Sequence, residues 1–217
     1  PDLFWALRGG GGNFGVVTSF LFRAHPVSTV YAGPIFWDAK DGKAVMRAYR
    51  DFLSKAPEEL GVFVGLKTVP PTDPFPREHW GKRACAVIGS YNGSAADGEK
   101  AIAPLLKELP APLFNWMGAM PFTAMQGLFD PFFPKGLQWY WKGDFVNSLP
   151  DEAIDAHIAQ ILKAPTDMAL MHLYPIDGAV RRVPGDATAW STRDATWSMV
   201  IAAIGNDPKQ AEALKTW

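Results

Sequence analysis

The sequence predicts an α+β domain built on a large antiparallel β-sheet, with α-helices on one of its faces. Runs of β-branched and aromatic residues recur along the 217 residues and indicate strands. Two stretches with helical periodicity interrupt these runs in the order strand, helix, strand, strand, helix, strand. This order is typical of a unit whose two helices cover the same face of an antiparallel sheet.

The first part of the chain carries its own signals. Residues 2–7 indicate a short helix or turn, and the stretch VVTSFLFR at 16–23 indicates a strand because it is β-branched and aromatic. His25-Pro26 ends that strand, since proline lacks the N–H group that a β-ladder requires. The clearest boundary in the chain therefore lies near residues 26–28.

Beyond this boundary, strands and helices alternate. Ser94 is expected to cap the second long helix after the turn Asn92-Gly93, and Ser148 or Asp151 is expected to cap the third. The predicted strands are 29–37, 60–69, 83–91, 113–118, 137–146, 168–174 and 197–204. The predicted helices are 40–55, 94–109, 151–163 and 207–217.

Composition argues against several classes of protein. Lys and Arg total 21 against 22 Asp and Glu, and the net charge of −1 argues against a nucleic-acid partner. The single cysteine, Cys85, cannot form an intrachain disulfide, and no Cys/His cluster suggests a metal site. We expect Cys85 to be a buried structural thiol, because its strand is apolar. No apolar run reaches the roughly 18–20 residues of a membrane span, so we expect no membrane partner. We also expect a cytoplasmic location.

Four consecutive glycines at 9–12 form the most unusual local feature of the sequence. Such a run lets the backbone approach a ligand closely, and its N–H groups can form an anion-binding nest. A dinucleotide-binding or phosphate-binding loop needs a strand before the glycines and a helix after them, whereas here the order is reversed. Composition alone is consistent with both a ligand-contacting loop and a flexible hairpin turn.

Three segments resemble the berberine-bridge-enzyme-like FAD-linked oxidases, a family of vanillyl-alcohol-oxidase-type flavoproteins. The most specific is the run from Arg8 through the glycines to Thr18. The others carry an Asp-Ala-Thr-Ala-aromatic motif and an aromatic strand with the helix that follows it. The three segments are 2–27, 177–193 and 138–155.

The resemblance implies a domain organisation and a cofactor. Residues 1–27 match the last hairpin of the FAD-binding lobe, and 28–217 match the substrate-binding cap domain, truncated before a final FAD-contacting segment. In the family, FAD is contacted largely through the backbone of the glycine-rich hairpin. This role falls here on Gly12, Asn13, Phe14, Gly15, Val16 and Val17. Because the rest of the FAD-binding lobe is absent, we expect the isolated fragment to lack FAD and to be inactive.

The chain departs from the family where some members carry a catalytic base. Those members place Glu or Gln on a strand that matches 197–204, and apolar Val200 stands at that position here. Thr192 stands where the family usually has His, beside a matching Arg193, and Trp197 replaces a family Tyr. The identity of the base is therefore open.

Strand periodicity supplies other candidates for the site. Gln138, Tyr140 and Lys142 share one face of their strand with Asp144, and we expect this mixed-polarity face to line the pocket. His172 and Tyr174 share a face of the next strand, where they serve a pocket or simply satisfy each other. The candidate catalytic residues are Tyr140, His172 and Tyr174. The candidate substrate-binding residues are Gln138, Tyr140, Lys142, His172 and Val200.

Two functions remain after these observations. The first is a fragment of an FAD-dependent oxidoreductase that acts on a small organic alcohol, sugar or alkaloid-like substrate by hydride transfer to flavin. The second is a non-catalytic α+β domain that binds a ligand or self-associates. Self-association of the isolated chain is expected, because separation from the missing FAD-binding lobe exposes an apolar surface.

Overall fold

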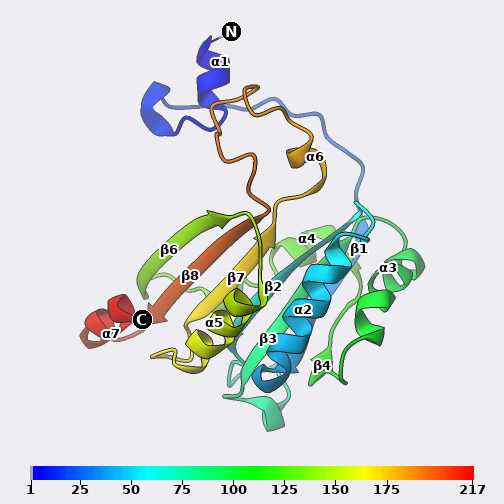
Figure 1. Ribbon diagram of the computed structural model, residues 1–217, viewed down its shortest axis with the longest axis vertical. Helices are drawn as coiled ribbons and strands as arrows, with labels where there is room; N and C mark the ends of the chain where they lie inside the picture. Colours follow the sequence, from blue (N-terminus) through cyan, green and yellow to red (C-terminus); the bar gives the residue numbers. More distant parts are fainter. Residues whose placement is uncertain (1) are drawn as a thin grey trace.

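The computed structural model describes residues 2–217 and centres on an eight-stranded sheet (Figure 1). Its strand order is β4-β1-β3-β2-β7-β8-β6, with β5 also paired to β1, and every pairing is antiparallel. The predicted α+β class is confirmed. The strands are β1 (Thr29–Asp38), β2 (Leu60–Thr68), β3 (Arg83–Tyr91), β4 (Phe114–Asn115), β5 (Gly118–Pro121), β6 (Gln138–Val146), β7 (Leu170–Pro175) and β8 (Trp197–Gly205).

Three long helices cover one face of this sheet (Figure 1). They are α2 (Gly42–Leu53), α3 (Ala95–Lys107) and α5 (Asp151–Leu162). The shorter helices are α1 (Asp2–Leu7), α4 (Phe122–Gln126), α6 (Gly178–Arg181) and α7 (Ala211–Thr216), and the 3-10 turns are η1 (Gly12–Phe14), η2 (Ala39–Asp41), η3 (Arg77–His79), η4 (Asp130–Phe132) and η5 (Pro208–Gln210). Among residues 2–217, no helix is both long and apolar enough to cross a membrane.

The structure confirms one of the two predicted helix caps and contradicts the other. Ser94 caps α3, because its hydroxyl accepts a hydrogen bond of 3.1 Å from the backbone N–H of Asp97. The residue before α5 is Pro150, which offers no side-chain cap, so the prediction of Ser148 or Asp151 is wrong. Asp151 binds α2 instead, with its carboxylate 2.8 Å from Arg50 and 3.1 Å from Arg47.

The main hydrophobic core lies between the sheet and the three long helices. Its largest members keep their polar atoms satisfied: the Tyr49 hydroxyl donates to the Val62 carbonyl at 3.0 Å, and the Trp37 indole donates to the Pro110 carbonyl at 2.8 Å. Cys85 is buried in this core, and burial raises the pKa of its thiol well above the usual value. The expectation of a buried structural thiol is confirmed.

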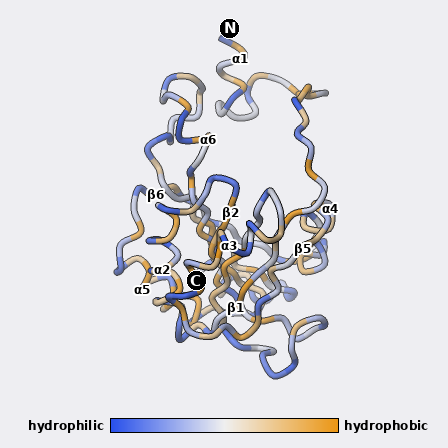
Figure 2. The backbone as a smooth tube through the Cα atoms, turned by 90° about the vertical axis from the view of Figure 1, so that its right-hand side faces the viewer, coloured by the Kyte–Doolittle hydropathy of each residue, from blue (hydrophilic) through white to orange (hydrophobic). Residues whose placement is uncertain are grey.

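Residues 15–28 leave the glycine-rich loop and reach β1 without forming a regular element. Figure 2 shows this segment running down one side of the molecule, apart from the sheet, with hydrophobic stretches along it. The strand predicted at 16–23 is therefore wrong. A strand needs a neighbour for its N–H and C=O groups, and none of the described strands pairs with residues 16–23. The side chain of Leu21 is fully exposed as a result.

Another predicted strand, 113–118, divides into the two short strands β4 and β5. Both pair with β1, and Trp116 and Met117 form the break between them. At this point β1 contains Gly33, whose φ of 142° lies in a region that side chains rarely adopt. A Cβ at Gly33 would collide with the Trp116 carbonyl, so the glycine allows the two backbones to approach each other at the break.

Candidate functional site

A cavity of about 730 Å³ lies on the face of the sheet opposite the long helices. Alternation along β1 and β2 explains its position: Ile35 and Val64 point into the helical core, whereas Phe36 and Phe63 line the cavity. Residues of the loops 72–75 and 128–133 also line it. The volume is typical of a site for a small organic ligand.

The floor of the cavity follows one cross-strand row of the sheet. The strand register aligns four residues that line the cavity, namely His172, Gly65, Ala86 and Phe36, across β7, β2, β3 and β1. The row continues to Val200 in β8, beyond the lining. Gly65 and Ala86, in the middle of this row, are small residues and so leave space above the sheet. A Cβ at position 65 would lie 3.3 Å from the His172 ring, so the glycine provides the space that the imidazole occupies.

Aromatic side chains form most of the walls. The Phe75 ring lies 5.0 Å from that of Trp116 and 5.4 Å from that of Phe132, between ring centroids. On the other side, Trp139 and Trp141 stack at 5.4 Å with their planes 26° apart. Walls of this kind exclude water and favour a planar, apolar ligand.

His172 and Tyr174 form a polar pair at the floor. The His172 Nδ1 lies 2.6 Å from the Tyr174 hydroxyl, and the Phe63 ring packs against both side chains. Burial, together with the nearby Lys67 ammonium, lowers the pKa of His172 to about 4, and burial raises the pKa of Tyr174. Near neutral pH, both side chains are therefore uncharged, and a proton can be shared between them.

The structure brings only some of the predicted pocket residues together. His172 and Tyr174 line the cavity, and Val200 faces the same side next to His172 without lining it. Tyr140 and Lys142 lie on the other face of β6, in a small depression beside α7, and Gln138 shares that face by alternation.

The prediction that the mixed-polarity face of β6 lines the pocket is thus wrong for this cavity. The aromatic face, which carries Trp139 and Trp141, lines it instead. The reason is that an aromatic face gains more from a water-excluding cavity, whereas Lys142 keeps its ammonium near solvent beside α7. Strand periodicity separates the two faces of an edge strand but does not say which of them the loops will cover.

Sequence reasoning missed Lys67 and the aromatic loop residues Phe75 and Phe132. The signal for Lys67 was present, because it is the one charged residue in the apolar strand 60–68 and shares a face with Phe63. The loop residues could not be assigned, since nothing local indicates which strand face a long loop will cover.

The glycine-rich loop forms a second feature, at the end of the molecule that carries α1. The Trp5 indole donates to the Asp186 carbonyl at 2.7 Å, and the Arg8 guanidinium donates to the Ala187 carbonyl at 3.1 Å. Two motifs about 180 residues apart in the sequence therefore lie side by side (Figure 1).

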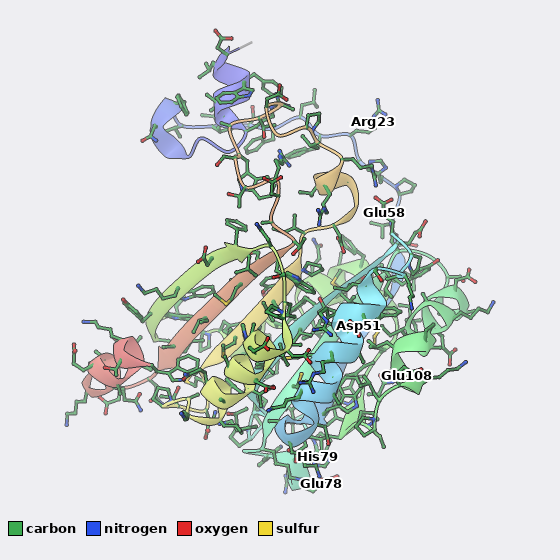
Figure 3. The ribbon with its side chains drawn as sticks, viewed as in Figure 1. Arg23, Asp51, Glu58, Glu78, His79 and Glu108 are labelled. Atoms are coloured by element: carbon green, nitrogen blue, oxygen red, sulfur yellow. The ribbon has the colours of Figure 1, made fainter. Side chains whose placement is uncertain are left out.

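An ion pair joins the loop after β7 to the sheet domain. Arg182 lies 2.7 Å from Glu58 and lowers the pKa of that carboxyl group. Glu58, labelled in Figure 3, lies where the sheet domain faces α6. Arg193, which matches the family motif, lies over the Trp190 ring and donates to the Thr188 hydroxyl at 2.7 Å, so it stabilises the loop internally.

The glycines of the loop have two separate roles. A Cβ at Gly9 would lie 2.5 Å from Trp190, and one at Gly10 would collide with the Ala6 carbonyl, so these two glycines allow close packing. A Cβ at Gly12 or Gly15 would meet nothing within 4 Å, and the side chains of Asn13, Phe14, Val16 and Val17 are exposed. Peptide groups at positions 12–17 can therefore be approached by a ligand. Among residues 2–217, no cluster of three or more His, Cys, Asp or Glu side chains could hold a metal ion.

The chain thus combines an antiparallel sheet, which carries helices on one face and an aromatic cavity on the other, with a docked glycine-rich loop. No protein-family model matches the chain. An FAD-linked oxidoreductase of Dictyostelium discoideum is 26% identical over 224 residues, which cover 100% of this chain and 45% of the relative. The xylooligosaccharide oxidase of Thermothelomyces thermophilus is 29% identical over 214 residues, which cover 89% of this chain and 40% of the relative.

The solved structures give the same result for the fold. Berberine bridge enzyme from Eschscholzia californica superposes with a TM-score of 0.76 at 18% identity, over 100% of this chain and 45% of that one. The resemblance to the berberine-bridge-enzyme-like FAD-linked oxidases is confirmed. The chain spans about half the length of the relatives that it matches.

Loop 9–17 fits the cofactor named by these relatives. FAD would be held here through peptide groups, because Gly12 and Gly15 leave space above the backbone and the Arg8 guanidinium already donates to the Ala187 carbonyl. The residues that would hold it are Gly12, Asn13, Phe14, Gly15, Val16 and Val17.

Proposed function

We propose that this chain supplies the substrate-side part of an FAD-dependent oxidoreductase that oxidises a small organic alcohol, sugar or alkaloid-like compound. The observation that carries this proposal is the uncharged His172–Tyr174 pair at the floor of an aromatic cavity. Similarity to FAD-linked oxidoreductases along the whole chain supports it. In this proposal, residues 1–27 belong to the FAD-binding lobe, and 28–217 form the substrate domain.

FAD, when bound, supplies the acceptor for the hydride that leaves the substrate carbon. The substrate hydroxyl must also lose a proton, and His172 and Tyr174 are positioned to take it. In the tautomer with an unprotonated Nδ1, the Tyr174 hydroxyl donates to His172 across 2.6 Å. The phenol oxygen then accepts the substrate proton as its own proton passes to Nδ1, while the aromatic walls exclude water.

The test uses the flavin-loaded, full-length protein in single-turnover flavin reduction. His172→Asn and Tyr174→Phe should each slow reduction by about 10²–10⁴-fold without loss of flavin absorbance, because each removes part of the proton route. Tyr140→Phe is the matched control and should leave the rate unchanged, since Tyr140 lies on the opposite face of the sheet. Unchanged reduction by the His172 and Tyr174 variants would overturn the proposed role.

A non-catalytic, self-associating domain is the second candidate. The exposed side chains of Phe20, Leu21 and Phe22 favour it for the isolated chain. Flavin absorbance distinguishes the two candidates. A chain that binds flavin absorbs near 450 nm, whereas a colourless, folded oligomer supports only the second candidate for the isolated chain. In both cases, the flavin-reduction experiment tests the activity of the longer protein.

A further inference from the structure

Lys67 is the cationic group of the aromatic cavity. It lies on β2 in the same face as Phe63 and Gly65, and its Nζ lies 5.4 Å from the centre of the Phe132 ring. Three other titratable side chains line the cavity, namely Asp73, His172 and Tyr174. Of these, His172 is uncharged near neutral pH, and the Tyr174 phenol is protonated.

Asp73 lines the same cavity, but its carboxylate forms no ion pair with this ammonium. Among residues 2–217, no carboxylate lies within ion-pair distance of Lys67, and no side chain or carbonyl accepts a hydrogen bond from it. Burial alone lowers the pKa of Lys67 to about 8, so the group is still mostly protonated at pH 7. A cation in an apolar cavity costs free energy unless something pairs with it.

Arg83 lies near Lys67 and, unlike it, has a structural role. Arg83, the first residue of β3, donates to the carbonyls of Ala164 and Thr166 at 3.0 and 3.2 Å and also reaches Asp167 at 3.6 Å. Its guanidinium holds the segment before β7 in place. Lys67 holds no segment in this way, and its ammonium faces the space where a ligand would lie.

We infer that Lys67 pairs with a carboxylate on the ligand of this cavity, and that the ligand is a planar aromatic acid. The aromatic walls suit the planar part, and Lys67 supplies the missing partner for a negative charge. This inference deepens the proposed function and names its substrate class. Lys67 and His172 are diagonal neighbours on β2 and β7, so an acid held at Lys67 presents another part of the molecule to the His172–Tyr174 pair.

Binding of two matched probes to the chain tests this inference. 2-Naphthoate and 2-naphthalenemethanol share a ring system and differ in charge, and quenching of tryptophan fluorescence by either reports occupancy near Trp116 and Trp139. At pH 7, the naphthoate should bind at least about ten-fold more tightly, since a charge-assisted hydrogen bond adds to the shared apolar contact. Equal affinities, or no binding of either probe, would overturn the inference.

Three variants test whether Lys67 causes the preference for the naphthoate. Lys67→Met should bring the two affinities together, and Lys142→Met, on the opposite face, should leave the preference intact. If Lys67→Met does not fold, Lys67→Arg still tests the inference: it should keep the preference at pH 9.5, where the native chain has lost it because Lys67 titrates near pH 8. A preference that survives in Lys67→Met, or that is insensitive to pH in the native chain, would contradict the assignment.

Failure of this inference and failure of the proposed oxidase function give different results. The naphthoate preference is measured without flavin, so it can hold in a protein that shows no substrate-driven flavin reduction. Conversely, flavin reduction that depends on His172 can occur with a neutral substrate, in which case the carboxylate preference is absent while the proposed function stands.

Discussion

At the scale of single residues, His172 is defined by what surrounds it rather than by its position in the sequence. The alternation of β7 predicts that it shares a face with Tyr174, and the structure agrees. The contact of 2.6 Å between the two side chains and the space left by Gly65 depend on neighbouring strands, which no local pattern reveals. The identity of the pair was therefore predictable, but its state of protonation was not.

Burial of His172 should make the stability of the protein depend on pH. The pKa of His172 is about 4 in the folded state and 6.5 in the unfolded state, so between these values the unfolded chain binds more protons. Stability therefore falls as the pH falls from about 6.5 to about 4. His172→Asn should remove on the order of 2 kcal/mol of this loss between pH 7 and pH 4.5, as measured by urea unfolding. An identical pH dependence in both proteins would show that His172 is accessible to protons in the folded state.

Gly65 should control the depth of the cavity floor. A Cβ there already lies 3.3 Å from both His172 and Ile88, so Gly65→Val must push side chains into the ligand space. We expect at least ten-fold weaker binding of 2-naphthalenemethanol, together with destabilisation of about 1–3 kcal/mol. Gly61→Val, on the same strand but with its Cβ 3.9 Å from the Ser90 carbonyl, is the control and should bind normally. Equal binding by the two variants would argue against ligand contact at the floor.

At the scale of elements, the sequence predicts a strand or helix correctly where the residues of that element alone determine it. The strand 83–91 was predicted with the bounds that β3 has, because it is a continuous apolar run ended by the turn Asn92-Gly93. Segment 16–23 has an equally clear strand composition, yet it forms none, since pairing requires a neighbour that local sequence cannot supply. The face of β6 was assigned wrongly for a related reason, because loops distant in sequence decide which face is covered.

The docking of the glycine-rich loop should depend on Gly9. Its φ is 117°, and a Cβ would lie 2.5 Å from Trp190, so Gly9→Ala should detach α1 from the loop at 186–190. Cleavage by trypsin after Arg8, whose guanidinium is bonded to Ala187, should then become several-fold faster. Gly12→Ala is the matched control, because its Cβ meets nothing within 4 Å, and it should be cleaved at the native rate. Native protection in Gly9→Ala would mean that the contacts of Trp5 hold the loop without the glycine.

At the scale of the whole molecule, the sheet separates two environments of different kinds. One face is covered by α2, α3 and α5 around a packed core (Figure 1). The other face carries the aromatic cavity. Stability and ligand binding thus depend on alternate residues of the same strands, as with Val64 and Phe63 on β2. A substitution on the cavity side can therefore change binding while the core remains intact.

The segment between α1 and β1 should make the isolated chain associate with itself. Phe20 and Phe22 stack at 5.4 Å on one side of the extended backbone, Leu21 is fully exposed on the other, and the unpaired peptide groups offer a strand edge. Light scattering should show oligomers between micromolar and millimolar concentration. Replacing Phe20 and Phe22 with Lys should shift the chain to the monomer, because charged side chains oppose edge pairing. Leu162→Lys, at an exposed apolar position at the end of α5, is the control and should associate like the native chain. A native chain that stays monomeric at millimolar concentration would exclude this surface as an interface between copies.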